Sequence, residues 1–186
     1  MKPKLIYILL ITFLISFSSS AQQKQIKFHS INQFGIVFGE SEENSVFQTI
    51  NGIQFSNWFS AIGIGVDDYR YKTLPLFIEG RRCFGDENKG FVYADLGYNF
   101  PLKNKPGKEV SYYDSYHFKG GIYTDVGVGF KVRLINKSSF LFSLGYSYKE
   151  LQTQIGVAPL CLGCSSYLYN YKFGYGRMIL KAGVEF

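Results

Sequence analysis

The chain has 186 residues, which is one domain's worth, and its 20 basic and 14 acidic residues give a modest net charge of +6. It contains no block of like charges and no basic helix, which disfavours nucleic acid as a partner. Tyrosine (15), phenylalanine (18) and glycine (20) are abundant and proline (5) is scarce. Glycine and aromatic residues, with little that favours helix, predict an all-β chain.

The amino terminus has the pattern of a secretory signal peptide. Two lysines precede an uncharged, mainly apolar run from Leu5 to Phe17, and small residues of the kind that signal peptidase accepts follow at 19–21. The run is too short for a comfortable membrane span. We therefore predict a cleaved signal over 1–21 and a mature domain over 22–186, with an uncleaved anchor as the alternative. Removing two lysines leaves a net charge of 18 − 14 = +4.

The rest of the chain reads as a series of strands, because apolar residues recur at every second position. We expect eight strands, at about 28–40, 45–55, 58–68, 74–83, 91–100, 121–134, 140–149 and 177–186. The two long connections, at 101–116 and 151–172, lie at the same end of an up-and-down meander, and the turns at the other end are short. Long loops at one end and tight turns at the other are typical of outer-membrane barrels.

The two faces of the predicted strands differ in chemistry. One face is branched aliphatic in mid-strand, with aromatic residues near the strand ends. The other is rich in glycine and carries charges of both signs, at Glu79, Arg81, Asp95, Asp125, Lys131, Arg133, Lys149 and Lys181. Such a set can form a satisfied internal ion-pair network, whereas isolated buried charges would be very costly.

This chemistry predicts an eight-stranded antiparallel up-and-down transmembrane β-barrel. The apolar face would contact lipid, and charged and small side chains would fill the lumen, so that the barrel is not a general pore. The alternative is a secreted soluble barrel of the lipocalin kind, in which the same two faces are reversed and the apolar face forms a lipid pocket.

The chain ends in a strand that alternates up to its final residue. Met178, Leu180, Ala182, Val184 and Phe186 fall on one face of this strand. In this the chain resembles small Gram-negative outer-membrane β-barrels of the OmpA/OmpX type, over about residues 27–186. In that family the barrel-assembly machinery recognises an alternating last strand that ends in an aromatic residue, so the resemblance implies that these five residues are an assembly signal. It also implies a location in the outer membrane, with outer-membrane lipid and the assembly machinery as partners, but it implies no activity.

Residues that could carry chemistry are few. Cys161 and Cys164 form a possible loop disulfide in an oxidising compartment, with two free thiols as the alternative. Cys83 should lie at the opposite end and is then a free thiol. His29 near the short turns and His117 near the long loops cannot share a site, because an apolar band of about 25 Å separates the two ends.

A hydrolase centred on His117 would need Asp114, Ser111 and Ser115 beside it, and nothing in the sequence fixes that geometry. We therefore assign no catalytic residue, no metal site and no cofactor. The long loops are rich in tyrosine with scattered lysine, which suits either a ligand-binding or adhesive surface or a girdle that meets lipid phosphates. The predicted role is structural or surface-binding, with a lipid-modifying enzyme and a secreted lipid-binding barrel as alternatives.

Overall fold

The computed structural model describes residues 26–39, 43–69, 72–102, 113–134, 138–157 and 167–186. Within these ranges nearly every residue lies in a strand, and the strands are β1 (Lys27–Phe38), β2 (Glu43–Phe55), β3 (Trp58–Asp68), β4 (Lys72–Phe84), β5 (Gly90–Pro101), β6 (Tyr113–Lys119), β7 (Gly121–Arg133), β8 (Ser139–Val157) and β9 (Tyr167–Glu185). A short 3-10 turn, η1 (Asp86–Asn88), joins β4 to β5. The described part of the chain has no helix that is long and apolar enough to cross a membrane.

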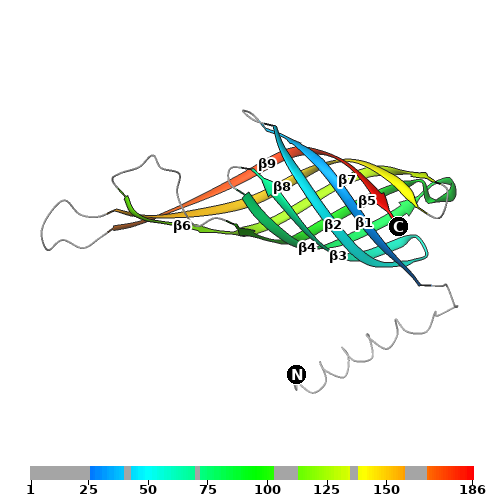
Figure 1. Cartoon of the computed structure of the whole chain (residues 1–186), viewed down its shortest axis with the longest axis horizontal. Coiled ribbons are helices and arrows are strands. Elements are labelled where there is room, and N and C mark those ends of the chain that lie inside the picture. The colour runs from blue at the N-terminus through cyan, green and yellow to red at the C-terminus, as the bar shows by residue number, and fades with distance from the viewer. Residues whose placement is uncertain (1–25, 40–42, 70–71, 103–112, 135–137, 158–166) are drawn as a thin grey trace, which may run out of the picture.

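Eight of the strands close into an antiparallel ring in the order β1-β2-β3-β4-β5-β7-β8-β9, and β9 returns to pair with β1 (Figure 1). Following paired residues from strand to strand around the ring leads from Phe28 of β1 back to β1 at Phe38. The paired residues on the way are Ile53, Ser60, Gly80, Ala94, Val126, Tyr146 and Met178. The shift of 38 − 28 = 10 residues over eight strands corresponds to a strand tilt of about 40°, and side chains can fill a ring of this size.

The two ends of the barrel have different connections. The β2–β3, β4–β5 and β7–β8 connections lie at one end, together with Lys27 and Phe186, and we call this the turn end. The β1–β2, β3–β4, β5–β6 and β8–β9 connections lie at the other, which we call the loop end. Cys83 is one residue from the end of β4 and therefore lies at the turn end, where its backbone N–H donates to the Asn57 carbonyl over 2.7 Å.

The outward face of the wall is apolar and exposed. In β3 exposed and buried residues alternate along the strand, and the outward residues Ile62, Ile64 and Val66 are 63%, 45% and 44% exposed. Exposed aromatic residues lie near strand ends, such as Trp58 at the turn end and Phe100 at the loop end. An exposed apolar band with aromatic rings at its borders is typical of a lipid-facing surface. The soluble alternative with an apolar lumen and a polar outside is therefore wrong.

Large apolar side chains nevertheless also enter the lumen. A buried cluster that extends from the turn end to the middle of the lumen contains Ile31, Ile50, Phe59, Ala61, Phe77, Cys83, Phe91, Tyr93, Tyr123 and Leu141. A lumen-facing glycine makes room for a ring here, since a Cβ added at Gly63 would overlap the ring of Phe77 on the next strand. The expected filling by charged and small side chains was thus incomplete, because each small residue leaves space that a ring on a neighbouring strand occupies.

Three strands continue past the barrel at the loop end. β8 and β9 are 19 residues each and stay paired to Val157 and Tyr167, whereas β9 pairs with β1 only from Met178 onward. β6 precedes β7 in the chain, with Gly120 between them, and pairs with residues 152–157 of β8 along the same edge that β7 occupies in the barrel, opposite β9. We call this three-stranded extension the arm, made of β6, residues 150–157 of β8 and residues 167–177 of β9; it projects at the left of Figure 1.

The arm corrects the predicted connections. The expected loops at 101–116 and 151–172 are shorter, because 113–116, 151–157 and 167–172 are strand residues. In the sequence YLYNYKFGYGR of the arm, tyrosine and phenylalanine alternate with Leu168, Asn170, Lys172 and glycine, and Arg177 ends the series. This stretch has a single aliphatic residue, Leu168, and so lacks the aliphatic face that marks the other strands. The strands of the arm pair with each other outside the ring.

Candidate functional site

The middle of the lumen contains a polar cluster centred on Asp125 of β7. The Lys181 Nζ lies 3.0 Å from the Asp125 Oδ2, and the Tyr93 hydroxyl donates to the Oδ1 over 2.9 Å. The Lys181 Nζ also lies 4.1 Å from the centroid of the Tyr93 ring. All three side chains are buried. The lysine charge is therefore compensated by a carboxylate and by the face of an aromatic ring.

A chain of hydrogen bonds crosses the lumen to this cluster. The Gln33 amide donates to the Gln48 side-chain oxygen over 2.7 Å, and the Gln48 amide donates to the Tyr123 hydroxyl over 2.9 Å. The Tyr123 hydroxyl in turn donates to Asp125 over 3.4 Å. Gln48 lies on β2 and Tyr123 on β7, which are four places apart in the eight-stranded ring. The Gln48–Tyr123 bond therefore spans the full diameter of the barrel.

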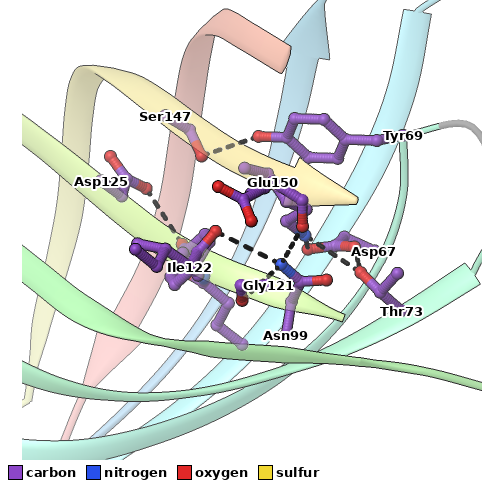
Figure 2. A network of polar contacts seen from close by, with 12 residues as sticks. Asp67, Tyr69, Thr73, Asn99, Gly121, Ile122, Asp125, Ser147 and Glu150 are labelled. Atoms are coloured by element: carbon purple, nitrogen blue, oxygen red, sulfur yellow. Dashed lines mark hydrogen bonds and ion pairs between the residues drawn. The ribbon is translucent and has the colours of Figure 1, made fainter. Parts of the chain in front are cut away.

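A second polar cluster closes the lumen nearer the loop end (Figure 2). Lys149 of β8 forms an ion pair with Asp67 of β3 and donates a hydrogen bond to Thr73 over 3.1 Å, while the Thr73 hydroxyl donates to Asp67. Tyr69, just after β3, donates to the Ser147 hydroxyl over 2.7 Å. Strands β3 and β8 are also four places apart in the ring. Both contacts between them therefore cross the whole lumen.

Asn99 fixes the point where the arm leaves the barrel. Its amide donates to the carbonyl oxygens of Gly121 and Glu150, each over 3.0 Å, and so joins β5 to β7 and β8 (Figure 2). A Cβ added at Gly120 would overlap the Asn99 carbonyl oxygen. The close approach of the two backbones at this point therefore requires glycine.

A third cluster lies toward the turn end. The Arg81 guanidinium bonds Glu79 through Nε and Nη2, both at 2.7 Å, and stacks 4.3 Å from the centroid of the Phe91 ring. Among the described residues no hydrogen-bond partner is found for the Glu79 Oε2, the Arg81 Nη1 or either oxygen of Asp95. The Asp95 Oδ2 lies 3.9 Å from the Lys181 Nζ. Of the three clusters, this one therefore has the most buried polar atoms without a hydrogen-bond partner.

Most of the residues that the sequence singled out for the lumen lie there together. Six of the eight are buried, namely Glu79, Arg81, Asp95, Asp125, Lys149 and Lys181. Lys131 lies at the turn-end mouth, where its Nζ is 2.7 Å from Glu185. Arg133 does not belong to the network: its side chain is 61% exposed and its Nη2 donates to the Glu87 carbonyl over 3.0 Å. As the last residue of β7 it lies past the rim, although its position in the alternation predicts an inward direction.

Several residues of the network were missed. They are Gln33, Gln48, Asp67, Tyr69, Thr73, Tyr93 and Tyr123, all of which are buried. All but Asp67 are uncharged, and Asp67 lies near the end of β3. Their place in the alternation could have identified most of them, since Asp67 shares a face with Gly63 and Gly65. Tyr69 lies beyond the end of β3 and carried no such signal.

The remaining predicted residues are separated or lie outside the described ranges. Cys83 is a buried free thiol, and Cys161, Cys164 and the segment 1–21 lie outside the described residues. His29 is at the turn end, 3.0 Å from Glu185. His117 is on β6 at the loop end, and its side chain and those of Ser111, Asp114 and Ser115 lie outside the description. No group of three or more metal-binding side chains occurs in the described ranges.

The arm carries a row of aromatic side chains on the face that continues the lumen. Tyr169, Tyr171, Phe173 and Tyr175 share the alternation of the lumen-facing Lys181. The ring centroids of Tyr171 and Phe173 are 6.3 Å apart with an angle of 17° between the planes, and those of Phe173 and Tyr175 are 6.4 Å apart with an angle of 29°. Tyr169 and Tyr171 are 51% and 47% exposed. A line of stacked rings therefore runs from the mouth of the barrel outward along β9.

These features define a class of protein: an antiparallel barrel with a lipid-facing wall and a lumen filled by its own side chains. The chain has the fold of a small Gram-negative outer-membrane β-barrel. It is similar to the solved structure of outer membrane protein AlkL in DMPC lipid bilayers, with a TM-score of 0.51, 14% identity, and coverage of 91% of this chain and 93% of that one.

A second solved structure is less similar. The outer membrane protein OprG from Pseudomonas aeruginosa matches with a TM-score of 0.49 and 13% identity, over 85% of this chain and 94% of that chain. No protein-family model matches the sequence, and no curated protein matches it. At 14% identity, the likeness to AlkL shows the fold alone.

Proposed function

We propose that the protein is a non-conducting outer-membrane barrel whose arm binds a ligand or another surface outside the cell. The observation that carries this proposal is the contrast between the two parts. The contacts of Lys149 with Asp67 and of Gln48 with Tyr123 cross the full lumen and leave it filled, whereas the same face of β9 is half exposed at Tyr169 and Tyr171.

The location in the outer membrane is supported by the wall and the fold. Barrels of this class place short turns in the periplasm and long connections outside the cell, so the arm lies outside. Residues 1–21 serve as the export signal and are removed. Outer-membrane lipid covers the apolar wall. The outward residues Met178, Leu180 and Phe186 are 48%, 48% and 61% exposed, and the barrel-assembly machinery reads this face of the last strand before it pairs with β1.

Gel mobility of protein extracted from fractionated membranes tests the location and the closed barrel together. A closed barrel resists cold detergent, so we expect an outer-membrane band whose mobility changes only after boiling. Protein found in the soluble periplasmic or secreted fraction, with no change of mobility on boiling, would contradict the membrane assignment.

Binding by the arm is supported by its chemistry. Tyrosine offers a large contact area for little loss of conformational entropy, and its ring takes the flat or apolar faces of a ligand while its hydroxyl makes a hydrogen bond. Arg177 stands at the inner end of the row, 5.8 Å from the centroid of the Tyr175 ring and 4.9 Å from that of Tyr69. A ligand that lies along the row would therefore meet rings first and a cation at the barrel mouth.

Two double variants of β9 test this role. Tyr169→Ser with Tyr171→Ser removes exposed rings from the inner face, and Leu168→Ser with Asn170→Ser changes the outer face of the same stretch as a control. Refolded proteins are applied to an array of immobilised bacterial and host-cell glycans and to cultured epithelial cells. We expect binding by the wild type and the control, and loss of binding by the inner-face variant. No binding by the wild type, or equal binding by all three proteins, would contradict the proposal.

A further inference from the structure

The turn end of the barrel contains a vestibule that the arm and the lumen network do not use. It has a volume of about 1080 Å³, and its lining comes from both ends of the described chain and from the β4–β5 and β7–β8 connections. This is large enough for an organic molecule, since ligand pockets typically measure roughly 300–1,000 Å³. It faces the periplasm in the orientation proposed above.

The charges that line the vestibule are predominantly positive. Its cationic side chains are those of Lys27, Lys89, Lys131 and Arg133, and its carboxylate side chains are those of Glu87 and Glu185. The balance of these side chains is therefore 4 − 2 = +2, with His29 and the carboxyl group of Phe186 not counted. An opening with this charge raises the local concentration of anions.

Both carboxylates already contact two basic side chains each. The Glu185 side chain lies 2.7 Å from the Lys131 Nζ on one side and 3.0 Å from the His29 Nδ1 on the other. Glu87 lies 3.2 Å from the Lys89 Nζ and 3.8 Å from Arg133. Each lysine has three N–H donors. The pairs therefore orient the cations around the cavity and leave them donors for a further anion.

His29 adds a polar atom that lacks a partner. Its Nδ1 faces Glu185, its ring packs edge-on against Phe59 with the centroids 6.4 Å apart, and its side chain is 19% exposed. Both ring nitrogens, Nδ1 and Nε2, are buried and neither has a hydrogen-bond partner among the described residues. A buried polar atom normally has a partner. A ligand in the vestibule would supply one.

We propose that the vestibule binds a phosphate ester, with Lys27, Lys89 and Lys131 supplying positive charge and His29 a hydrogen bond. Lysine ammonium groups bind phosphate as point charges, and several of them around one cavity suit a tetrahedral anion better than a planar carboxylate. Exposed apolar residues stand at the rim, among them Phe28 and Phe186. The phosphate belongs either to a lipid headgroup that enters past this rim or to a soluble ester in the periplasm.

The two histidines of the chain provide a direct measurement. Full-length mature protein with ¹⁵N-labelled histidine, refolded in uncharged maltoside micelles, is titrated with glycerol 3-phosphate and separately with dihexanoyl phosphatidylglycerol. We expect the imidazole signal of His29 to shift and that of His117, at the loop end, to stay in place. A shift with both compounds identifies a soluble ester as sufficient, and a shift with the lipid alone identifies a lipid headgroup.

Matched charge variants establish where the anion binds. Lys27→Gln with Lys89→Gln removes two cations from the vestibule, and Lys72→Gln with Lys119→Gln removes two exposed lysines at the loop end. We expect the vestibule variant to weaken binding roughly fivefold or more and the control to bind as the wild type. Neither pair lies in the lumen, and mobility on unboiled gels verifies folding. No shift of His29 with either compound, or equal weakening in the two variants, would overturn the proposal.

Discussion

Strands β8 and β9 run through both the barrel and the arm, yet the inward faces of these two regions have opposite properties. In the barrel Lys149 of β8 and Lys181 of β9 are 0% and 2% exposed. Ten residues earlier along β9, Tyr171 is 47% exposed on the same face. Pairing between β8 and β9 is continuous through both regions. Closure of the ring by the other strands therefore turns this face into a core, and beyond the ring the face is open to a ligand.

The largest expected effect comes from breaking the ion pair that crosses the lumen. Asp67→Ala leaves the ammonium group of Lys149 buried without its carboxylate, and loss of one partner of a buried pair costs about 3–5 kcal/mol. The free energy of unfolding, measured by urea denaturation from lipid vesicles, should fall by that amount.

A double variant provides the control for this prediction. Asp67→Leu with Lys149→Met replaces both charges by apolar groups of similar size, which is often nearly neutral for stability. We expect it to be clearly more stable than Asp67→Ala. If the two proteins are equally unstable, the cost does not arise from an unpaired charge.

Overpacking of the lumen should have the next largest effect. Gly63→Val places methyl groups where the Phe77 ring lies, and such crowding costs about 1–3 kcal/mol. Gly80 on the outward face has open space at the same position, so Gly80→Val should be much milder. The free energies of unfolding of the two variants are compared. A larger loss for Gly80→Val than for Gly63→Val would contradict the prediction.

Removal of a single hydroxyl from the cross-lumen chain should cost less. Tyr123→Phe removes the acceptor for Gln48 and the donor to Asp125, and such a loss is worth about 1 kcal/mol, or more because Gln48 is left buried and unsatisfied. Tyr98→Phe changes an exposed ring and should leave stability unaltered. Equal effects of both substitutions in urea denaturation would argue that the cross-lumen chain contributes nothing.

The smallest effect on stability is expected in the arm. Tyr169→Ser with Tyr171→Ser should change the unfolding free energy by less than about 0.5 kcal/mol per site, because both rings are half exposed and outside the closed ring. The same variant should lose binding. A large loss of stability would mean that the arm is part of the folding core.

The sequence predicted the barrel well because closure imposes strict alternation on every strand. The bounds of β3 agree with the prediction, and the apolar face of β9 points outward as expected. The strands of the arm were not predicted, because a segment rich in tyrosine and glycine without an aliphatic face has the composition of a loop.

The candidate site could be predicted only in part. Alternation assigns a direction to each side chain, and so Asp95, Asp125 and Lys181 were placed in the lumen. Which side chains meet depends on the ten-residue shift around the ring, which brings Gln48 to Tyr123 and Asp67 to Lys149. No local pattern in one strand carries that shift. Arg133 was misplaced for a related reason, since the alternation gives direction but not depth.

Conductance across a planar bilayer shows whether the side chains of the lumen close the barrel to ions. The mature protein, folded in lipid and inserted at a low copy number, is measured in 1 M KCl. The structure predicts no discrete conductance steps from the wild type, because contacts from opposite strands fill the barrel. Stable, reproducible channel openings by the wild type would contradict this account.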